Sequence, residues 1–333
     1  MSRVLIAGGT GAIGAALARR LLRDPAFEVR VADDRPAPQW MRESCELRSG
    51  DLRAPGEARA AMDGCSHVVH LASAEHANVE LDGLPFTAIE HDALSTLALI
   101  RAALDLEVER FVYASSARVF ERAETFPTPE DYLLQCPVAV SPTGAAALSG
   151  ERACRAAYAE QGFRFTICRP FDVYSDVPTA TEDGGVESES ELDALLGELA
   201  RGASAAAAAA GGTFEPIAAG ERTRTPTHVQ DVAAGLALAL GSPKAVGEDF
   251  NLGGAHELAL AEIARIAWEA CDGPPEALSL KPPRALQPGP ERSAPSSQKA
   301  RRLLGWSADV QAQEGLAASA RRALAASPST AVA

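Results

Sequence analysis

A glycine-rich loop, GGTGAIG at residues 8–14, follows a short apolar run and precedes a stretch with helical spacing of Leu and Ala. The loop fits G-x-G-x-x-G through Gly9, Gly11 and Gly14, and it also fits G-x-x-G-x-x-G beginning at Gly8. Glycines at these points permit a tight turn without Cβ atoms, so that backbone N–H groups at a helix N-terminus can approach a pyrophosphate. A strand, this loop and a helix in that order predict a dinucleotide-binding unit.

An acidic residue stands where the second strand of such a unit should end. Asp33 follows Gly14 by 19 residues, close to the spacing of about 20 expected for the acid that binds the adenosine ribose. Asp33 and Asp34 together disfavour a 2′-phosphate, which predicts NAD, with NADP the less favoured cofactor. Arg35 follows at once and could offset part of that preference.

Short apolar runs alternate with longer helical patterns through the first half of the chain. Such alternation predicts a parallel sheet that helices cover on both faces. The expected fold class is α/β, a Rossmann-type doubly wound parallel sheet with a smaller C-terminal substrate-binding region. The expected strands are residues 3–8, 28–33, 67–73, 110–116 and 164–170, and the expected helices are residues 12–24, 93–106 and 147–162.

The second half is less regular, and helical patterns at residues 228–240 and 257–273 stand among acidic and proline-rich segments. The alanine-rich segment 203–212 either extends the helix before it or frays into a loop. The expected organisation is a NAD-binding Rossmann domain of residues 1–175 and about 226–252, a substrate-binding region of residues 176–225 and 253–325, and a disordered tail at 326–333.

Composition narrows the class of partner and the compartment. The formal net charge is −14, and a surface that acidic repels nucleic acid and anionic membranes. No run of about 18 apolar residues is present, and the six cysteines lack C-x-x-C or zinc spacing, as expected in a reducing cytosol. The six histidines show no H-x-x-x-H spacing, which argues against a metal site. We therefore expect a cytoplasmic protein that acts on a small molecule.

Further segments occur in the order typical of one large family. After the glycine loop come SGDLR at 49–53, VVHLAS at 68–73, RFVYASSARVF at 110–120, CRPFDVYS at 168–175, GERTRTPTHVQDVAAG at 220–235, FNLGG at 250–254 and KARRLLGW at 299–306. With them the chain resembles the extended short-chain dehydrogenase/reductase family, especially its NAD-dependent sugar-nucleotide epimerases and dehydratases. The resemblance covers nearly the whole chain. It implies a NAD cofactor, a nucleotide-sugar or related substrate, and a homodimer formed through the helices around 93–104 and 144–160.

The resemblance also implies roles for individual residues. Ser116 takes the place of the active-site serine, although a serine there can also simply close a hydrogen bond at a strand end. Asp172 and Arg224 take the places of residues that bind the substrate's diphosphate. Cofactor-binding roles fall on Gly8, Gly11, Ala12, Ile13, Gly14, Asp33, Asp34, Asp51, Leu52, Leu71, Ala72, Ser73 and Pro170.

The catalytic helix departs from the family pattern. In the family this helix carries Tyr-x-x-x-Lys, and the alignment on SPTGAAALSGE, residues 141–151, puts Thr143 at the tyrosine and Ala147 at the lysine. Nearby positive charge can bring the pKa of a phenol from about 10 towards neutrality, whereas a threonine hydroxyl is far less acidic. Because general acid–base help is worth about 10²–10⁴-fold, the usual hydride chemistry should be severely weakened.

Three functions stay open at this level. The first is an epimerase/dehydratase-type enzyme with altered catalysts, for which Tyr132 and Cys136, in the loop before the catalytic helix, are candidate replacements. The second is a non-catalytic NAD-binding pseudoenzyme that serves as a sensor or partner subunit. The third is a different reaction with NAD as a prosthetic group, supported by Asp172, which replaces an asparagine of the family. Glu130 and Asp131 read as a solvated acidic loop.

Overall fold

The computed structural model describes residues 1–71, 85–176, 179–180, 186–187, 190–208, 214–216, 222–280 and 290–326. By its contacts, the chain divides into two compact units, each with a buried apolar cluster of its own. Unit 1 comprises Met1–Pro170, Gln230–Leu252 and Pro295–Ser307, and unit 2 comprises Phe171–Val229, Gly253–Ala294 and Ala308–Ala333.

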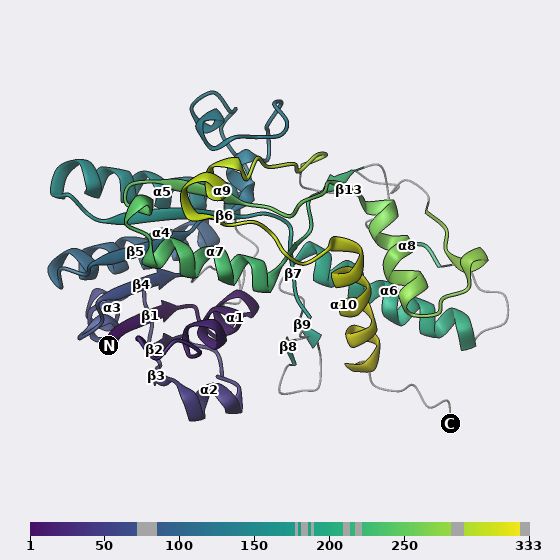
Figure 1. Ribbon diagram of the computed structural model, residues 1–333, viewed down its shortest axis with the longest axis horizontal. Helices are drawn as coiled ribbons and strands as arrows, with labels where there is room; N and C mark the ends of the chain where they lie inside the picture. Colours follow the sequence, from purple (N-terminus) through teal and green to yellow (C-terminus); the bar gives the residue numbers. More distant parts are fainter. Residues whose placement is uncertain are drawn as a thin grey trace. The chain divides into compact units, whose positions relative to one another are not determined.

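Seven parallel strands form the sheet of unit 1, in the order β12-β6-β5-β4-β1-β2-β3 (Figure 1). The strands are β1 (Ser2–Ala7), β2 (Phe27–Ala32), β3 (Glu46–Arg48), β4 (His67–His70), β5 (Arg110–Ala114), β6 (Phe165–Pro170) and β12 (Asp249–Leu252). Val4, Leu5 and Ile6 are fully buried, as expected of a sheet that helices cover on both faces. The predicted α/β fold with a parallel Rossmann-type sheet is confirmed.

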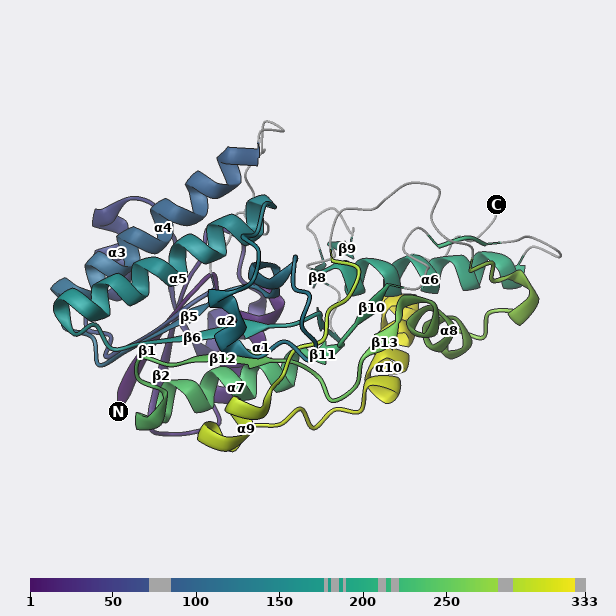
Figure 2. The same ribbon diagram turned by 90° about the horizontal axis from the view of Figure 1, so that it is seen from above.

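Helices pack on both faces of this sheet. Three of them, α3, α4 and α5, lie side by side on one face, and α7 lies on the other (Figure 2). Leu99 of α4 and Cys154 of α5 share a buried cluster with Leu5 of the sheet. The helices of unit 1 are α1 (Ala12–Leu21), α2 (Gln39–Ser44), α3 (Pro55–Met62), α4 (Pro85–Asp105), α5 (Pro142–Gln161), α7 (Val229–Gly241) and α9 (Gln298–Leu304).

Residues 295–307 belong to unit 1, although the sequence suggested a place in the substrate-binding region. Ser296 donates its backbone N–H to the carbonyl of Thr128 at 2.8 Å. The Nε1–H of Trp306 donates to the carbonyl of Asp231 in α7, also at 2.8 Å. Trp306 is almost fully buried, so this segment returns to unit 1 to complete its packing.

Among its described residues, unit 2 contains three α-helices and short strands. Its helices are α6 (Glu191–Ala208), α8 (Leu260–Ala270) and α10 (Ala312–Ala326), and they pack on one another around a cluster that includes Leu199, Ile263 and Leu316. The alanine-rich segment extends α6 as far as Ala208, in keeping with the high helix propensity of alanine. The strands pair as β7 (Val173–Tyr174) with β11 (Thr227–His228), β10 (Thr223–Arg224) with β13 (Leu258–Ala259), and β8 (Thr179–Ala180) with β9 (Val186–Glu187).

Three further properties bear on function. In the part of the chain that the structure describes, no helix is long and apolar enough to cross a membrane. All six cysteines carry free thiols. Over the same residues, no group of three or more His, Cys, Asp or Glu side chains could hold a metal ion. The compartment stays a prediction from the sequence.

Candidate functional site

The glycine loop connects β1 to α1 with backbone geometry that other residues would not tolerate. Gly8 has a φ of 78°, in the left-handed region that favours glycine. A Cβ on Gly14 would lie 2.5 Å from the Cα and 2.6 Å from the carbonyl oxygen of Gly9. Helix α1 begins after Gly11 with no side-chain cap and no acid in its first turn. The positive end of its dipole is therefore not neutralised by side chains of that turn, which favours an anion there.

Asp33 lies directly after β2 and is fixed against this loop. Its Oδ2 accepts a hydrogen bond from the backbone N–H of Thr10 at 2.9 Å, and its Oδ1 accepts from the Nε–H of Arg35 at 3.3 Å. Burial opposes ionisation of Asp33, but the charge of Arg35 and the bonds from Thr10 outweigh it and hold its pKa below the ordinary value. Asp33 is therefore ionised at neutral pH, while its neighbour Asp34 is exposed.

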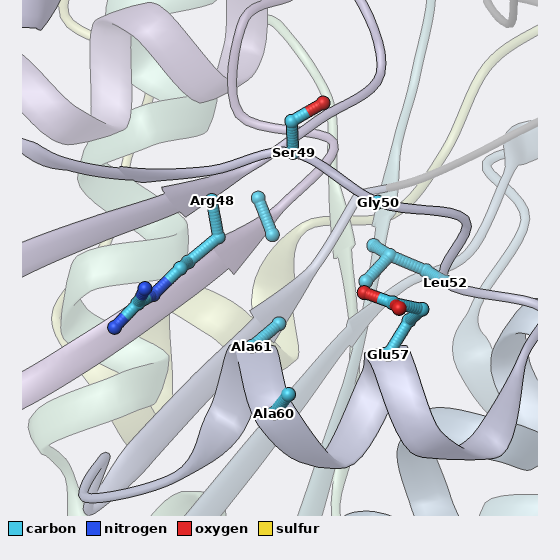
Figure 3. A pocket seen from close by; sticks show the side chains of 8 residues that line it. Arg48, Ser49, Gly50, Leu52, Glu57, Ala60 and Ala61 are labelled. Atoms are coloured by element: carbon cyan, nitrogen blue, oxygen red, sulfur yellow. The ribbon is translucent and has the colours of Figure 1, made fainter.

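Asp51 and Leu52 follow β3, and Leu52 lines a cavity of unit 1. The Oδ2 of Asp51 forms an ion pair of 2.8 Å with the Nη2 of Arg53, and this hydrogen bond lowers the pKa of Asp51. Leu52 and Glu57 point into a cavity of about 170 Å³ (Figure 3). Its lining consists of Ala32, Arg48, Ser49, Gly50, Leu52, Glu57, Ala60 and Ala61.

The remaining cofactor candidates stand at the carboxyl ends of neighbouring strands. Leu71 follows β4 and donates its backbone N–H to the carbonyl of Ala7, the last residue of β1, at 2.8 Å. Pro170 ends β6 and is half-buried. The strands β1, β4, β5 and β6 are parallel neighbours, so their carboxyl ends lie along the same side of the sheet. Leu71 and Pro170 therefore lie on the same side as the glycine loop, where ligands of such folds bind. Ala72 and Ser73 lie outside the described residues.

The two catalytic candidates lie close to that edge in unit 1. Ser116 follows β5, and its Oγ accepts the backbone N–H of Arg118 at 3.1 Å, which caps a short 3₁₀ helix at Ala117–Phe120. Thr143 is a half-buried residue in the first turn of α5. A Cβ on the next residue, Gly144, would lie 2.8 Å from the carbonyl oxygen of Arg118. The structure therefore brings the first turn of α5 against the segment that carries Ser116.

The loop before α5 contains side chains that are more buried and hydrogen-bonded than its sequence suggests. Glu130 is only 6% exposed, and its carboxylate accepts the backbone N–H of Asn251 at 2.9 Å, so the prediction of a solvated residue is wrong for Glu130. Burial raises the pKa of Glu130 and also that of the Cys136 thiol. The hydroxyl of Tyr132 accepts the backbone N–H of Glu124 at 3.3 Å.

Glu151, the one acid of the SPTGAAALSGE stretch, forms a buried ion pair. Its carboxylate accepts from the Nε–H of Arg169 at 2.6 Å, from Arg169 Nη2 at 2.7 Å and from the hydroxyl of Ser115 at 2.7 Å. Arg169 also donates to the carboxylate of Asp249 at 2.7 Å. Lys299 of α9 donates to the Asp249 carboxylate as well, at 2.6 Å. The network joins α5, β6, β12 and α9. It was not predicted, and the local sequence carries no signal that would pair these residues.

Unit 2 contains both substrate-binding candidates. Asp172 has a φ of 43°, and its Oδ2 accepts the backbone N–H of Thr225 at 2.8 Å. Burial raises the pKa of Asp172, although Arg224 lies only 3.7 Å from its carboxylate and acts in the opposite direction. Arg224 is 1% exposed, and its guanidinium pairs with Glu191 at 2.9 Å. The structure thus brings the predicted residues Asp172 and Arg224 together. It adds Glu191, an acid that the sequence did not single out.

Comparison with known proteins places these observations in a family. Residues 4–253 match the sequence model of the NAD dependent epimerase/dehydratase family. The chain is 28% identical to UDP-glucuronic acid decarboxylase 1 of Xenopus tropicalis over 328 residues, covering 94% of this chain and 70% of the relative.

Among solved structures, the chain is similar to UDP-glucose 4-epimerases. The Thermotoga maritima structure with UDP-glucose gives a TM-score of 0.79 at 22% identity and covers 96% of this chain and 98% of that one. The Thermus thermophilus complex with NAD gives a TM-score of 0.75 at 25% identity, with the same coverage of both chains.

Proposed function

Because the chain belongs to the NAD-dependent epimerase/dehydratase family, we propose that it binds NAD and acts on a nucleotide-sugar or related small molecule by transient hydride transfer. The glycine loop carries the proposal, since a Cβ on Gly14 would overlap Gly9 and no acid of the first turn competes for the α1 N-terminus. A pyrophosphate suits that geometry, because it needs close backbone N–H groups and a positive helix end.

The proposed cofactor site lies along the carboxyl edge of the sheet. When bound, NAD supplies the hydride acceptor that reactions of this family use. The ionised Asp33 disfavours a 2′-phosphate, and Arg35 donates to Asp33, which supports NAD over NADP. We assign the pyrophosphate to Gly8, Gly11, Ala12, Ile13 and Gly14, the ribose to Asp33 and Asp34, the adenine to Asp51 and Leu52, and the rest of the cofactor to Leu71, Ala72, Ser73 and Pro170.

The proposed reaction proceeds without the tyrosine and lysine of the family, which Thr143 and Ala147 replace. Ser116 is the residue best suited to contact a substrate oxygen. Its Oγ already accepts from Arg118, but a hydroxyl also carries one hydrogen that it can donate. Thr143 can likewise donate a hydrogen bond, although its hydroxyl is too weak an acid to act as an efficient base.

The alternative is a non-catalytic NAD-binding pseudoenzyme. Three observations favour it over replacement of the lost catalysts. Tyr132 already accepts a hydrogen bond from its own loop, and the raised pKa of Cys136 leaves a neutral thiol near neutral pH. Glu151 pairs with Arg169 and is 1% exposed, so it does not serve as a general base for a ligand.

We also propose a homodimer through α4 and α5. Leu94 and Leu97 of α4 are 45% and 54% exposed, and their i, i+3 spacing puts them on one face of the helix. An exposed apolar stripe of that kind suits burial against a second copy of the same helix.

Turnover of UDP- and dTDP-sugars by the NAD-loaded protein tests the proposal, with product analysis by NMR. We expect slow product formation by the wild type and an increase of about 10²–10⁴-fold when Thr143→Tyr is combined with Ala147→Lys. Gly14→Val is the control that should abolish NAD binding, because its side chain would enter the space of Gly9. If the wild type forms no product with NAD bound while the double variant does, the pseudoenzyme is favoured. If the wild type is as fast as the double variant, the pseudoenzyme is ruled out.

A further inference from the structure

The guanidinium of Arg224 uses all of its hydrogen-bond donors within unit 2. Nε donates to Glu191 Oε2 at 3.1 Å, and Nη2 donates to Glu191 Oε1 and Oε2 at 3.0 and 2.9 Å. Nη1 donates to the carbonyl oxygens of Thr223 and Pro290 at 2.7 and 3.0 Å. An arginine has five N–H groups, so each already has a partner in the chain. An anionic ligand can bind Arg224 only if one of these partners leaves.

Glu191 is the partner that can leave. It is the first residue of α6, and its side chain is 31% exposed, whereas Arg224 is 1% exposed. The two carbonyl partners belong to the backbone and cannot turn away, because side-chain rotation does not move them. Carboxylates and phosphates match the two-pronged donor face of arginine in the same way. Glu191 therefore occupies the position that a phosphate of a ligand would need.

The cations around Arg224 are already matched by carboxylates of the described residues. Arg222 is a second cation, 3.8 Å from Glu191, and Asp172 is a second acid, 3.7 Å from Arg224. In the part of the chain that the structure describes, Arg222 and Arg224 thus face the carboxylates of Glu191 and Asp172. A diphosphate that approached while Glu191 stayed in place would add negative charge beside the Glu191 carboxylate and meet repulsion at short range.

We propose that Glu191 is a specificity-determining residue, an internal carboxylate that occupies Arg224 and selects against ligands with a diphosphate. The inference rests on the proposed function, which puts Arg224 at the substrate, and it narrows that function: small molecules of low negative charge are favoured, and UDP- or dTDP-sugars bind weakly. A nucleoside diphosphate binds only by displacing Glu191, so its affinity is reduced by the free energy of that ion pair.

Isothermal titration of the NAD-loaded full chain with UDP tests this inference. The variant is Glu191→Gln, which keeps the size of the side chain and removes its charge. Glu314→Gln is the matched control, because Glu314 is an exposed acid of α10 and its replacement changes the net charge equally. We expect weak UDP binding by the wild type, an affinity at least about tenfold higher in Glu191→Gln, and little change in Glu314→Gln. The gain should disappear when Arg224→Lys is added, since lysine lacks the two-pronged donor face.

Each outcome bears on the inference separately from the proposed function. Equal UDP affinity in the wild type and Glu191→Gln overturns it, whether that affinity is high or undetectable. High affinity in both would instead favour a nucleotide-sugar substrate. NAD binding is measured first in its own titration. If NAD does not bind, the proposed function is contradicted. UDP titration of the cofactor-free chain then still tests whether Glu191 lowers the affinity for UDP.

Discussion

Replacing Glu151 with alanine removes the centre of the buried network that joins α5 to the sheet. In the wild type, Glu151 accepts two hydrogen bonds from Arg169 and one from Ser115, and Glu151 and Arg169 are 1% and 0% exposed. Without Glu151, Arg169 keeps its contact with Asp249 at 2.7 Å. Asp249 already pairs with Arg155 and Lys299, so the charge of Arg169 is left only partly compensated in a site that excludes water.

The magnitude follows from the burial of this pair. Removing one partner of a buried ion pair costs about 3–5 kcal/mol, because the remaining charge is desolvated without compensation. For a unit of this size, 1 kcal/mol moves the melting temperature by about 2–4 °C. We therefore expect Glu151→Ala to lower the melting temperature of unit 1 by about 6–20 °C.

Differential scanning calorimetry measures this change, because it can resolve transitions of two units that unfold separately. Glu314→Ala is the control, since it removes an exposed acid of a helix in unit 2. Combining Glu151→Leu with Arg169→Met should recover much of the loss, because it removes both buried charges and leaves Asp249 paired with Arg155 and Lys299. A shift below about 2 °C for Glu151→Ala would refute the reasoning.

Two further predictions concern pH and assembly. Burial opposes ionisation of Asp249, but Arg169 and Lys299 outweigh it and lower its pKa. Its stabilising contribution is therefore complete above about pH 5 and is lost progressively as the pH falls further, so the difference in melting temperature between wild type and Asp249→Asn should narrow between about pH 5 and pH 3. Replacing Leu97 with glutamate should convert the proposed dimer to a monomer, as measured by light scattering. Leu238→Glu, at an exposed site on α7, is the control and should leave the mass unchanged. A dimer mass for the Leu97 variant would exclude the Leu94 and Leu97 face of α4 as the interface.

The sequence predicted the elements whose signals are local. The run RVLIAG, the glycine loop and the leucine and alanine spacing of residues 12–24 identify β1, the turn and α1, because strand and helix periodicities are properties of neighbouring residues. Strand β3, Glu46–Arg48, gave no such signal, since three residues are too few to show alternation. The extension of α6 through alanine was one of two alternatives, because propensity alone does not decide whether a helix continues.

The pairings within the site could not be predicted in this way. Glu130 is held by the backbone of Asn251, 121 residues away, and its neighbours in the sequence suggest solvent. The partners Glu151, Arg169 and Asp249 come from a helix and two strands that meet only after the sheet forms. A glycine motif is recognisable because its chemistry lies in consecutive residues, whereas an ion pair between distant elements leaves no mark in either local sequence.

The Glu151–Arg169 and Glu191–Arg224 pairs have similar geometry but different environments, and this difference assigns them different roles. Glu151 and Arg169 are both buried, so exchanging the carboxylate for a ligand would require water or a ligand to enter the core. Glu191 is 31% exposed beside a buried Arg224, so it can rotate into solvent and be replaced by another anion. Glutamine at position 191 keeps a side-chain oxygen that can accept from Arg224, and water can reach this half-exposed position. Glu191→Gln should therefore lower the melting temperature by less than Glu151→Ala does, while raising the affinity for UDP.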